Sequence, residues 1–306
     1  MRPVRTFALA LASIALAACA SSATPAASPP AASPSPTPAP TVPATATPSP
    51  SPSAESAALL LEVTSEGGFI NPSANLAALP TVAVYTDGRI FTPGAIDSIL
   101  PGPLVVPVVV RDVGSAGAAA ILAAIKQAGL DKPATGGPGI PGDSGTNVFT
   151  TVVDGTTTTT RLAGGGPPGP GGPGAASGDL ERAAALELLN RLLDPAETWG
   201  AGSAPETPYA PPGYRIYVAP GATPSTDPST NQAPVAWPLP AGLDGFGAPA
   251  QPDRGIAGLR QGMVLGADAT TLTPILKAAT AATPFTSGDK IYTLWVRPLL
   301  PDETGG

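Results

Sequence analysis

The stretch "VAVYTDGRIF", residues 82–91, predicts a β-hairpin and indicates the fold class of the chain. Apolar and polar residues alternate on both sides of Asp87-Gly88, a pair that suits the tight turn between two antiparallel strands. A second stretch of this kind, residues 147–162 ("NVFTTVVDGTTTTTRL"), is expected to turn at Asp154-Gly155. Two hairpins in one chain favour antiparallel sheet as the framework of the fold.

Helical patterns follow both hairpins. The first covers about Gly117–Ala128, with Ser115 as its cap and with apolar residues 121, 122, 125 and 128 on one face. The second covers about Asp179–Leu193, with a stripe at Leu186, Leu189 and Leu193 and an i,i+4 pair of Glu187 and Arg191. A third lies near Thr271–Ala282, where Pro274 blurs the start. Further strands are expected at Leu59–Val63, Leu104–Val110 (pushed to a sheet edge by Pro107), Tyr214–Val218 and Ile291–Val296.

These elements predict an α+β fold in which antiparallel sheet packs with two or three helices. The order strand, hairpin, helix occurs twice, so two similar halves are an alternative to one continuous sheet. The domain is expected to cover residues 57–306, with a flexible Gly/Pro loop near residues 164–178.

The first 18 residues have the features of a secretory signal: a basic start, the apolar run "FALALASIALAA" and small residues before a boundary. The boundary Leu16-Ala17-Ala18-Cys19 resembles the lipobox of bacterial lipoproteins. The resemblance implies that Cys19 carries a diacylglyceryl group and becomes the N-terminus of the mature protein. The alternative is an ordinary secretory cut after Ala17, with Cys19 incidental.

Residues 19–56 form a tract of Ala, Ser, Thr and Pro. Such a tract buries too little apolar area to offset its ordering entropy, so it is expected to be a disordered linker between anchor and domain. In extended geometry it would reach on the order of 100 Å from the membrane. Both a plain spacer and an O-glycosylated one fit this composition.

The composition excludes several classes of protein. The chain has no histidine, one cysteine and a net charge of −7, with no basic run after Arg5. Zinc and iron–sulfur sites built from Cys and His are therefore excluded, and nucleic acid is an improbable partner. We therefore predict no cofactor, no metal site and no catalytic residue from the sequence.

Two motifs resemble catalytic segments without completing them. Residues 142–145 ("GDSG") are similar to the nucleophile segment of trypsin-type serine proteases, but no histidine is present to take the serine proton, so a turn is predicted. Paired carboxylates could hydrolyse glycosidic bonds, although no spacing among the 22 acidic residues singles out a pair.

Aromatic residues gather in a Pro-rich region, and they form the candidate binding surface. Tyr and Trp are typical anchors of interfaces, and beside prolines they could form a platform for a sugar or a peptide. The alternative is that the core uses these side chains, because aromatics are few in this chain. The candidates are Trp199, Tyr209, Tyr214, Tyr217 and Trp237.

Two short motifs resemble a known group of proteins. Tyr85-Thr86-Asp87-Gly88-Arg89 fits a Y-x-D-G-R hairpin, and residues 297–303 read "RPLLPDE" after a strand. Together with the lipobox "LAAC", these resemble uncharacterised secreted lipoproteins of high-GC bacteria. The resemblance implies a location and an architecture but no activity. Within the second motif, Arg297 is expected to pair with Asp302 or Glu303.

The sequence therefore predicts a lipoprotein held through its acyl chains on the outward-facing side of a bacterial membrane, in the cell envelope. Its domain is expected to be a non-catalytic binding or accessory module for an envelope protein, a peptide or a glycan. Two alternatives remain: a carboxylate-based envelope hydrolase, and an inhibitor-like domain acting on another exported protein.

Overall fold

The computed structural model describes residues 57–66, 75–97, 100–133, 145–163, 177–200, 205–221, 231–251 and 255–304. The chain divides into two units, residues 1–51 and 52–306, and all described residues belong to the second. Several predictions lie outside the described residues: the signal, Cys19, the linker, most of the "GDSG" segment, and residues 164–176 of the Gly/Pro loop.

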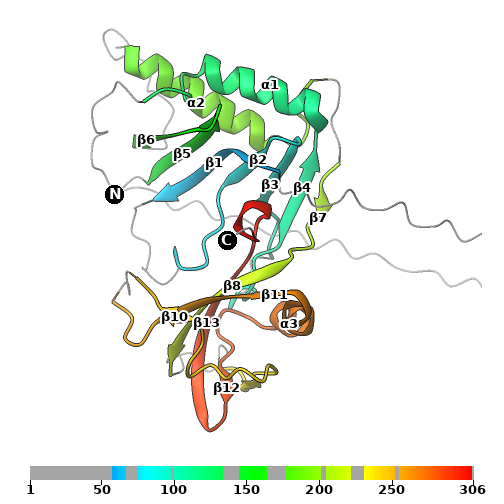
Figure 1. The fold of residues 1–306 in the computed structure, drawn as a ribbon, viewed down its shortest axis with the longest axis vertical. Helices are drawn as coiled ribbons and strands as arrows, with labels where there is room; N and C mark the ends of the chain where they lie inside the picture. The colour runs from blue at the N-terminus through cyan, green and yellow to red at the C-terminus, as the bar shows by residue number, and fades with distance from the viewer. Residues whose placement is uncertain are drawn as a thin grey trace, which may run out of the picture. The chain divides into compact units, whose positions relative to one another are not determined.

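The first sheet has seven strands in the order β6-β5-β1-β2-β3-β4-β7, and all its pairs are antiparallel. Helices α1 (Gly114–Gln127) and α2 (Ser177–Leu193) lie side by side over one face of this sheet (Figure 1). The strands are β1 (Leu59–Glu66), β2 (Val82–Tyr85), β3 (Arg89–Pro93), β4 (Val108–Asp112), β5 (Thr146–Val153), β6 (Thr156–Ala163) and β7 (Thr207–Pro208).

The second sheet has six strands in the order β10-β11-β8-β13-β12-β9, of which only β9 and β12 pair in parallel. Helix α3 (Gly266–Ala278) packs against it, and the described chain ends in a short 3-10 helix, η3 (Pro301–Thr304). The strands are β8 (Gly213–Pro220), β9 (Val235–Ala236), β10 (Ala248–Pro249), β11 (Arg260–Leu265), β12 (Phe285–Ser287) and β13 (Lys290–Pro298).

The predicted α+β class is confirmed: two mostly antiparallel sheets pack with three helices. Both copies of the order strand, hairpin, helix lie in the first sheet. The second sheet comes from residues 213–298, where the sequence pattern predicted two strands and one helix and missed the four strands β9 to β12. The repeated order therefore describes one sheet and not two similar halves.

Both Asp-Gly hairpins are confirmed, but the two-residue turn expected from the Asp-Gly pair forms only in the second of them. Asp154 and Gly155 form a two-residue turn with φ of +52° and +75°, as the pair predicts. The first hairpin has a three-residue loop, Thr86–Gly88. A Cβ on Gly88 would lie 2.2 Å from the carbonyl oxygen of Gly114, so this glycine also allows the hairpin to pack on the start of α1.

The first two helices differ from the prediction in detail. Helix α1 has Val113 at its N-cap and no side-chain cap, so Ser115 does not cap it; the predicted apolar face at Ile121 and Ile125 is buried as expected. In α2 the buried stripe is Ala185, Leu188, Leu189 and Leu192, while Leu193 is 41% exposed. The predicted partner of Arg191 was also wrong, because Arg191 pairs with Glu197 in the loop after the helix.

Two proline predictions also need correction. Pro107 lies before β4, and this strand pairs on both sides, with β3 and β7, so it is not an edge. Pro274 lies inside α3, which begins and ends earlier than the predicted 271–282. A proline has no backbone N–H to donate. Strand β4 therefore begins only after Pro107, whereas α3 continues through Pro274.

Candidate functional site

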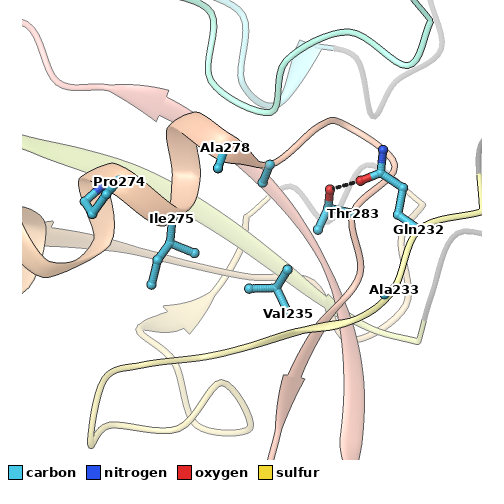
Figure 2. Close-up of a pocket in the computed structure, with 8 residues that line it drawn as sticks. Gln232, Ala233, Val235, Pro274, Ile275, Ala278 and Thr283 are labelled. Atoms are coloured by element: carbon cyan, nitrogen blue, oxygen red, sulfur yellow. Dashed lines mark hydrogen bonds between the residues drawn. The ribbon is translucent and has the colours of Figure 1, made fainter.

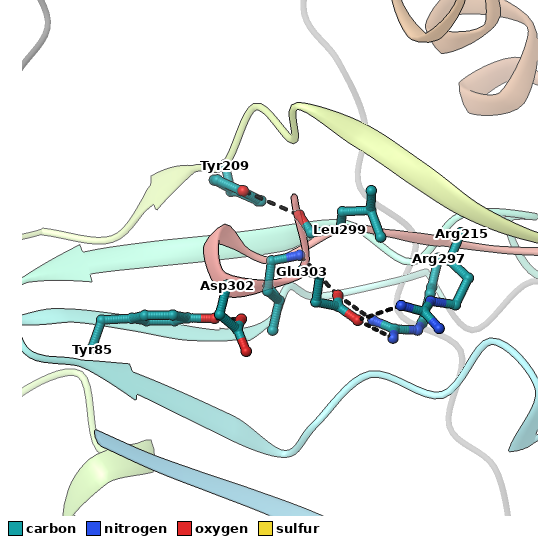
Figure 3. A network of polar contacts seen from close by, with 8 residues as sticks. Tyr85, Tyr209, Arg215, Arg297, Leu299, Asp302 and Glu303 are labelled. Atoms are coloured by element: carbon teal, nitrogen blue, oxygen red, sulfur yellow. Dashed lines mark hydrogen bonds and ion pairs between the residues drawn. The ribbon is translucent and has the colours of Figure 1, made fainter. Parts of the chain in front are cut away.

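The two motifs of the family resemblance meet where the first sheet contacts the C-terminal segment. The hydroxyl of Tyr85, in β2, donates a 2.5 Å hydrogen bond to Oδ1 of Asp302, in η3 (Figure 3). The Tyr85 side chain is fully buried, whereas Asp302 is exposed. Sequence spacing alone could not pair these two residues.

Glu303 anchors η3 to the second sheet. Its carboxylate accepts two hydrogen bonds from the guanidinium of Arg297, one of them Nη1 to Oε2 at 2.7 Å, and one from Arg215 at 3.3 Å. It also accepts the backbone N–H of Leu300 at 3.0 Å. The prediction that Arg297 pairs with Asp302 or Glu303 is confirmed for Glu303, and the two side chains are only 15% and 16% exposed.

A third contact set holds the end of β13. The hydroxyl of Tyr209 donates to the carbonyl of Leu299 at 3.1 Å, and its ring packs edge-on against Phe91 with centroids 4.9 Å apart. The guanidinium of Arg89, the last residue of the Y-x-D-G-R motif, lies 5.5 Å from the Phe91 centroid. We refer to Tyr85, Tyr209, Arg215, Arg297, Asp302 and Glu303 as the motif junction.

The electrostatics of the motif junction follow from burial and from its carboxylates. Burial, with the charges of Asp302 and Glu303, raises the pKa of Glu62 in β1, and Arg297 opposes this. Burial and the bond to Asp302 raise the pKa of Tyr85, while burial raises that of Tyr209 to about 12. Both phenols are therefore neutral hydrogen-bond donors near pH 7. Their hydroxyl groups are already bonded within the protein, so the motif junction has a structural role.

A separate groove lies beside α3 (Figure 2). It has a volume of about 630 Å³, within the range of small-molecule sites. Carbon atoms dominate the lining, and none of the eight described side chains that form it is ionisable. The lining residues are Gln232, Ala233 and Val235 around the start of β9, Pro274, Ile275 and Ala278 of α3, and Ala279 and Thr283 after it.

One end of the groove is polar and ordered by a chain of hydrogen bonds. The backbone N–H of Thr280 donates to Oγ1 of Thr283 at 2.9 Å, and the Thr283 hydroxyl donates to Oε1 of Gln232 at 2.5 Å. Because Oε1 is the acceptor of this bond, the amide nitrogen of Gln232 is not used by Thr283, and Figure 2 shows it pointing away from Val235 and Ile275.

The five aromatic candidates do not form one surface. Trp199, Tyr214 and Trp237 are buried, the first in the core of the first sheet and the other two in the core of the second. Tyr209 and Tyr217 are half-buried in two further apolar clusters. The predicted platform is therefore wrong. A chain with few aromatic residues uses them as core volume, where their large apolar area stabilises most.

The polar atoms of three of these aromatic side chains are bonded internally. Tyr214 shares a 2.9 Å hydrogen bond with Thr273, Trp237 donates to the carbonyl of Ala241 at 2.9 Å, and Tyr209 donates to Leu299.

The groove was not predicted from the sequence. The two segments that line it lie about 40 residues apart in the chain. The only feature of the sequence that marks either segment is the proline within α3.

In the described ranges, no group of three or more Asp, Glu or Cys side chains comes together in a way that could hold a metal ion. Among the described helices, none has the length and apolar character needed to span a membrane.

Comparison of the chain with protein-family models, with curated proteins and with solved structures finds no match. The family resemblance carried by Y-x-D-G-R and RPLLPDE therefore stays a prediction. What the structure adds is a physical role for both motifs, because their side chains bond to each other in the motif junction.

Proposed function

We propose that this chain is an envelope lipoprotein, anchored through Cys19, whose α+β domain binds a ligand in the groove beside α3 without catalysing a reaction. The observation that carries the proposal is the groove itself: an open cavity of about 630 Å³ with no ionisable side chain among the described residues of its lining. A site of this kind supplies mainly apolar contact, which suits binding. Its described lining residues supply no carboxylate, amine or thiol.

The anchoring part of the proposal rests on the sequence. Cys19 is the one thiol of the chain and follows the lipobox-like run Leu16-Ala17-Ala18. Two or more acyl chains on this residue would hold the protein firmly on a bilayer, since each buried methylene contributes about 0.8 kcal/mol. The linker of residues 20–56 would then separate the domain from the membrane surface.

The anchor is tested by cell fractionation and intact-mass measurement of the mature protein. The wild-type chain should be found with membranes and carry the added mass of its acyl groups, and Cys19→Ser should move it to the soluble fraction. A serine substitution at the neighbouring residue on the mature side, Ala20→Ser, is a matched control that leaves the thiol in place. Membrane retention of Cys19→Ser would refute the anchor.

The binding site is tested by native mass spectrometry of the Cys19→Ser chain purified from its host. A small molecule should co-purify, and Ala278→Leu, which fills the groove from an exposed helical position, should release it. Leu193→Ala on α2 removes an exposed apolar side chain elsewhere and serves as the control. Equal retention of the molecule in Ala278→Leu would place the binding site outside the groove.

One observation favours the hydrolase alternative. Glu62 has a raised pKa beside the charges of Asp302 and Glu303, which is an environment that catalytic acids share. Glu303, however, is occupied by two arginines, and Asp302 accepts the Tyr85 hydroxyl. A turnover on wall glycans or peptides that Glu62→Gln abolishes would favour this alternative over binding.

A further inference from the structure

We propose that strand β6 is a dimerisation edge, where two copies of this chain pair antiparallel around Thr159 and join their first sheets into one continuous sheet. This interface is independent of the groove beside α3 and of the anchor at Cys19. Among the described strands, β6, β7, β9 and β10 form the four outer edges of the two sheets (Figure 1).

Three of these four edges are protected against pairing with another chain. Strands β7, β9 and β10 are each two residues long. Pro208 ends β7 and Pro249 ends β10, while Pro234 and Pro238 lie on either side of β9. Short strands and prolines are common protections of a sheet edge, because a proline has no N–H to offer to an added strand.

Strand β6 has neither of these protections. It is eight residues long, and it contains no proline and no lysine. Its one charged residue, Arg161, has its Nε 3.5 Å from Oε2 of Glu66 in β1, so the guanidinium lies over the face of the sheet and not out past its edge. Five of the eight residues are threonines, which favour strands. We therefore expect the outer edge of β6 to pair.

The turn at Asp154-Gly155 determines which backbone groups of β6 face outward. In a two-residue hairpin the residues that flank the turn bond to each other, so Thr156 and every second residue after it bond to β5. Thr157, Thr159 and Arg161 therefore direct their N–H and C=O groups away from the sheet, and no described strand pairs with them. All three side chains are exposed, so the edge is accessible.

A second copy of β6 complements these three positions. An antiparallel pair centred on Thr159 sets this residue opposite its own copy, and sets Thr157 opposite Arg161 of the other copy. Three N–H groups from each copy then give about six hydrogen bonds between the edges. Cross-strand threonine pairs are favourable, and each Arg161 lies on the side of the other copy's Asp154 turn. A parallel pair would instead set Arg161 against Arg161.

Other occupants fit this edge less well. The linker, residues 20–56, contains eleven prolines, so it lacks the regular N–H groups of a paired strand. Sites that bind foreign peptides by strand addition select them through pockets for alternate side chains. The side chains that would face such a peptide on β6 are two exposed threonines and one arginine, which match their own copy and specify no other sequence.

The test is sedimentation velocity of the Cys19→Ser chain, which has no thiol. The mass should rise from one chain to two over about 1–300 µM, because one strand pair buries a small area and gives a weak dimer. Thr159→Lys sets two ammonium groups opposite each other and should raise the dissociation constant about tenfold or more. Thr159→Val keeps the backbone bonds and the preference for strand, so its constant should stay within about threefold.

Two proline variants separate this edge from a general effect on the protein. Thr159→Pro removes an outward N–H that β5 does not use, and it should abolish the dimer. Ala236→Pro makes the same change on β9, where Val235 and Trp237 donate inward at 2.9 Å and 2.8 Å, and it should leave the dimer unchanged. Thermal unfolding shows whether each variant is folded. Thr159→Lys, at an exposed side chain, decides the matter if Thr159→Pro does not fold.

Cysteine cross-linking tests the register. In the Cys19→Ser background, Thr159→Cys should oxidise to a covalent dimer, since opposite residues of an antiparallel pair have Cα atoms about 5.5 Å apart, within the range of a disulfide. Ala236→Cys on the edge of β9 is the control and should stay monomeric.

A Cys19→Ser chain that remains monomeric at about 300 µM would overturn the proposal, because even a small specific interface associates in this range. A dimer that Thr159→Lys and Thr159→Pro both leave unchanged would also overturn it. A peptide that co-purifies with the monomeric chain in native mass spectrometry, and that Thr159→Lys releases, would assign the edge to a foreign strand and show that the second copy is wrong.

Discussion

Tyr85 and Asp302 lie 217 positions apart in the sequence, and the hydroxyl of one donates a 2.5 Å hydrogen bond to the carboxylate of the other. The bond joins the hairpin motif Y-x-D-G-R to the C-terminal motif RPLLPDE. It connects β2 of the first sheet to η3, which Glu303 ties to the second sheet. The two sheets are therefore coupled through the last turn of the described chain.

Tyr85→Phe should reduce the free energy of unfolding by about 1.5–3 kcal/mol, the range for a hydrogen bond to a charged partner. The ring of the new residue keeps its edge-on packing with Phe91, so the change isolates the hydroxyl. Urea unfolding followed by fluorescence measures the effect. The matched control is Tyr217→Phe, at a half-buried tyrosine of the second sheet. Equal unfolding midpoints for Tyr85→Phe and the wild type would contradict the assigned role.

Glu303→Gln should cost more than Glu197→Gln, although both remove one partner of an arginine pair. Glu303 is 16% exposed and bonds to Arg297, Arg215 and a backbone N–H. Its substitution leaves two guanidinium groups without their carboxylate, which should lower the free energy of unfolding by about 2–4 kcal/mol. Glu197 pairs with Arg191 at 2.6 Å in a more exposed place, where about 0–1 kcal/mol is expected. The two free energies of unfolding decide this; similar values would show that the motif junction is not special.

Glu62→Gln should stabilise the protein near pH 7 and lose that advantage in acid. The folded-state pKa of Glu62 lies above its ordinary value of 4.5, so the folded protein binds this proton more tightly than the unfolded chain does. Its contribution to stability is therefore favourable only at low pH and falls as pH rises from the unfolded pKa through the folded pKa. Unfolding of both proteins at pH 4 and at pH 7 measures this, and a constant difference between them would contradict the raised pKa.

Arg111→Met should destabilise the chain by about 2–4 kcal/mol, because it removes two hydrogen bonds at the C-terminal end of α2. The buried guanidinium, 3% exposed, donates to the carbonyls of Leu192 and Asp194 at 2.7 Å and 2.5 Å. A cation at this end also complements the helix dipole. Arg161→Met, at an exposed arginine of β6, is the control and should change stability by less than about 0.5 kcal/mol. Equal effects at both positions would refute the role of Arg111.

The parts of the fold that could be predicted depend on neighbours in sequence. Asp154-Gly155 turns as expected because a positive φ at both positions is a local property of that pair. Ile121 and Ile125 are buried together because four residues make about one helical turn. The stripe of α2 was misjudged at Leu193, since which side of a helix is buried depends on the sheet it meets.

The candidate site could not be predicted in the same way. The five aromatic residues follow one another in a Pro-rich region, which indicates a single surface, yet packing distributes them among four apolar clusters. The groove combines Gln232–Val235 with Pro274–Ala279, and nothing in either segment indicates the other.

By itself the sequence determined the α+β class, the two hairpins at Asp-Gly pairs and the pairing of Arg297 with one of the acidic residues 302 and 303, because each depends on residues close together along the chain. Only the tertiary structure decided that Tyr85 bonds to Asp302, that the aromatic side chains are core, and that an uncharged groove opens beside α3. Contacts between distant segments are selected by the packing of whole sheets and helices, where apolar burial is non-directional and no local pattern specifies the partner.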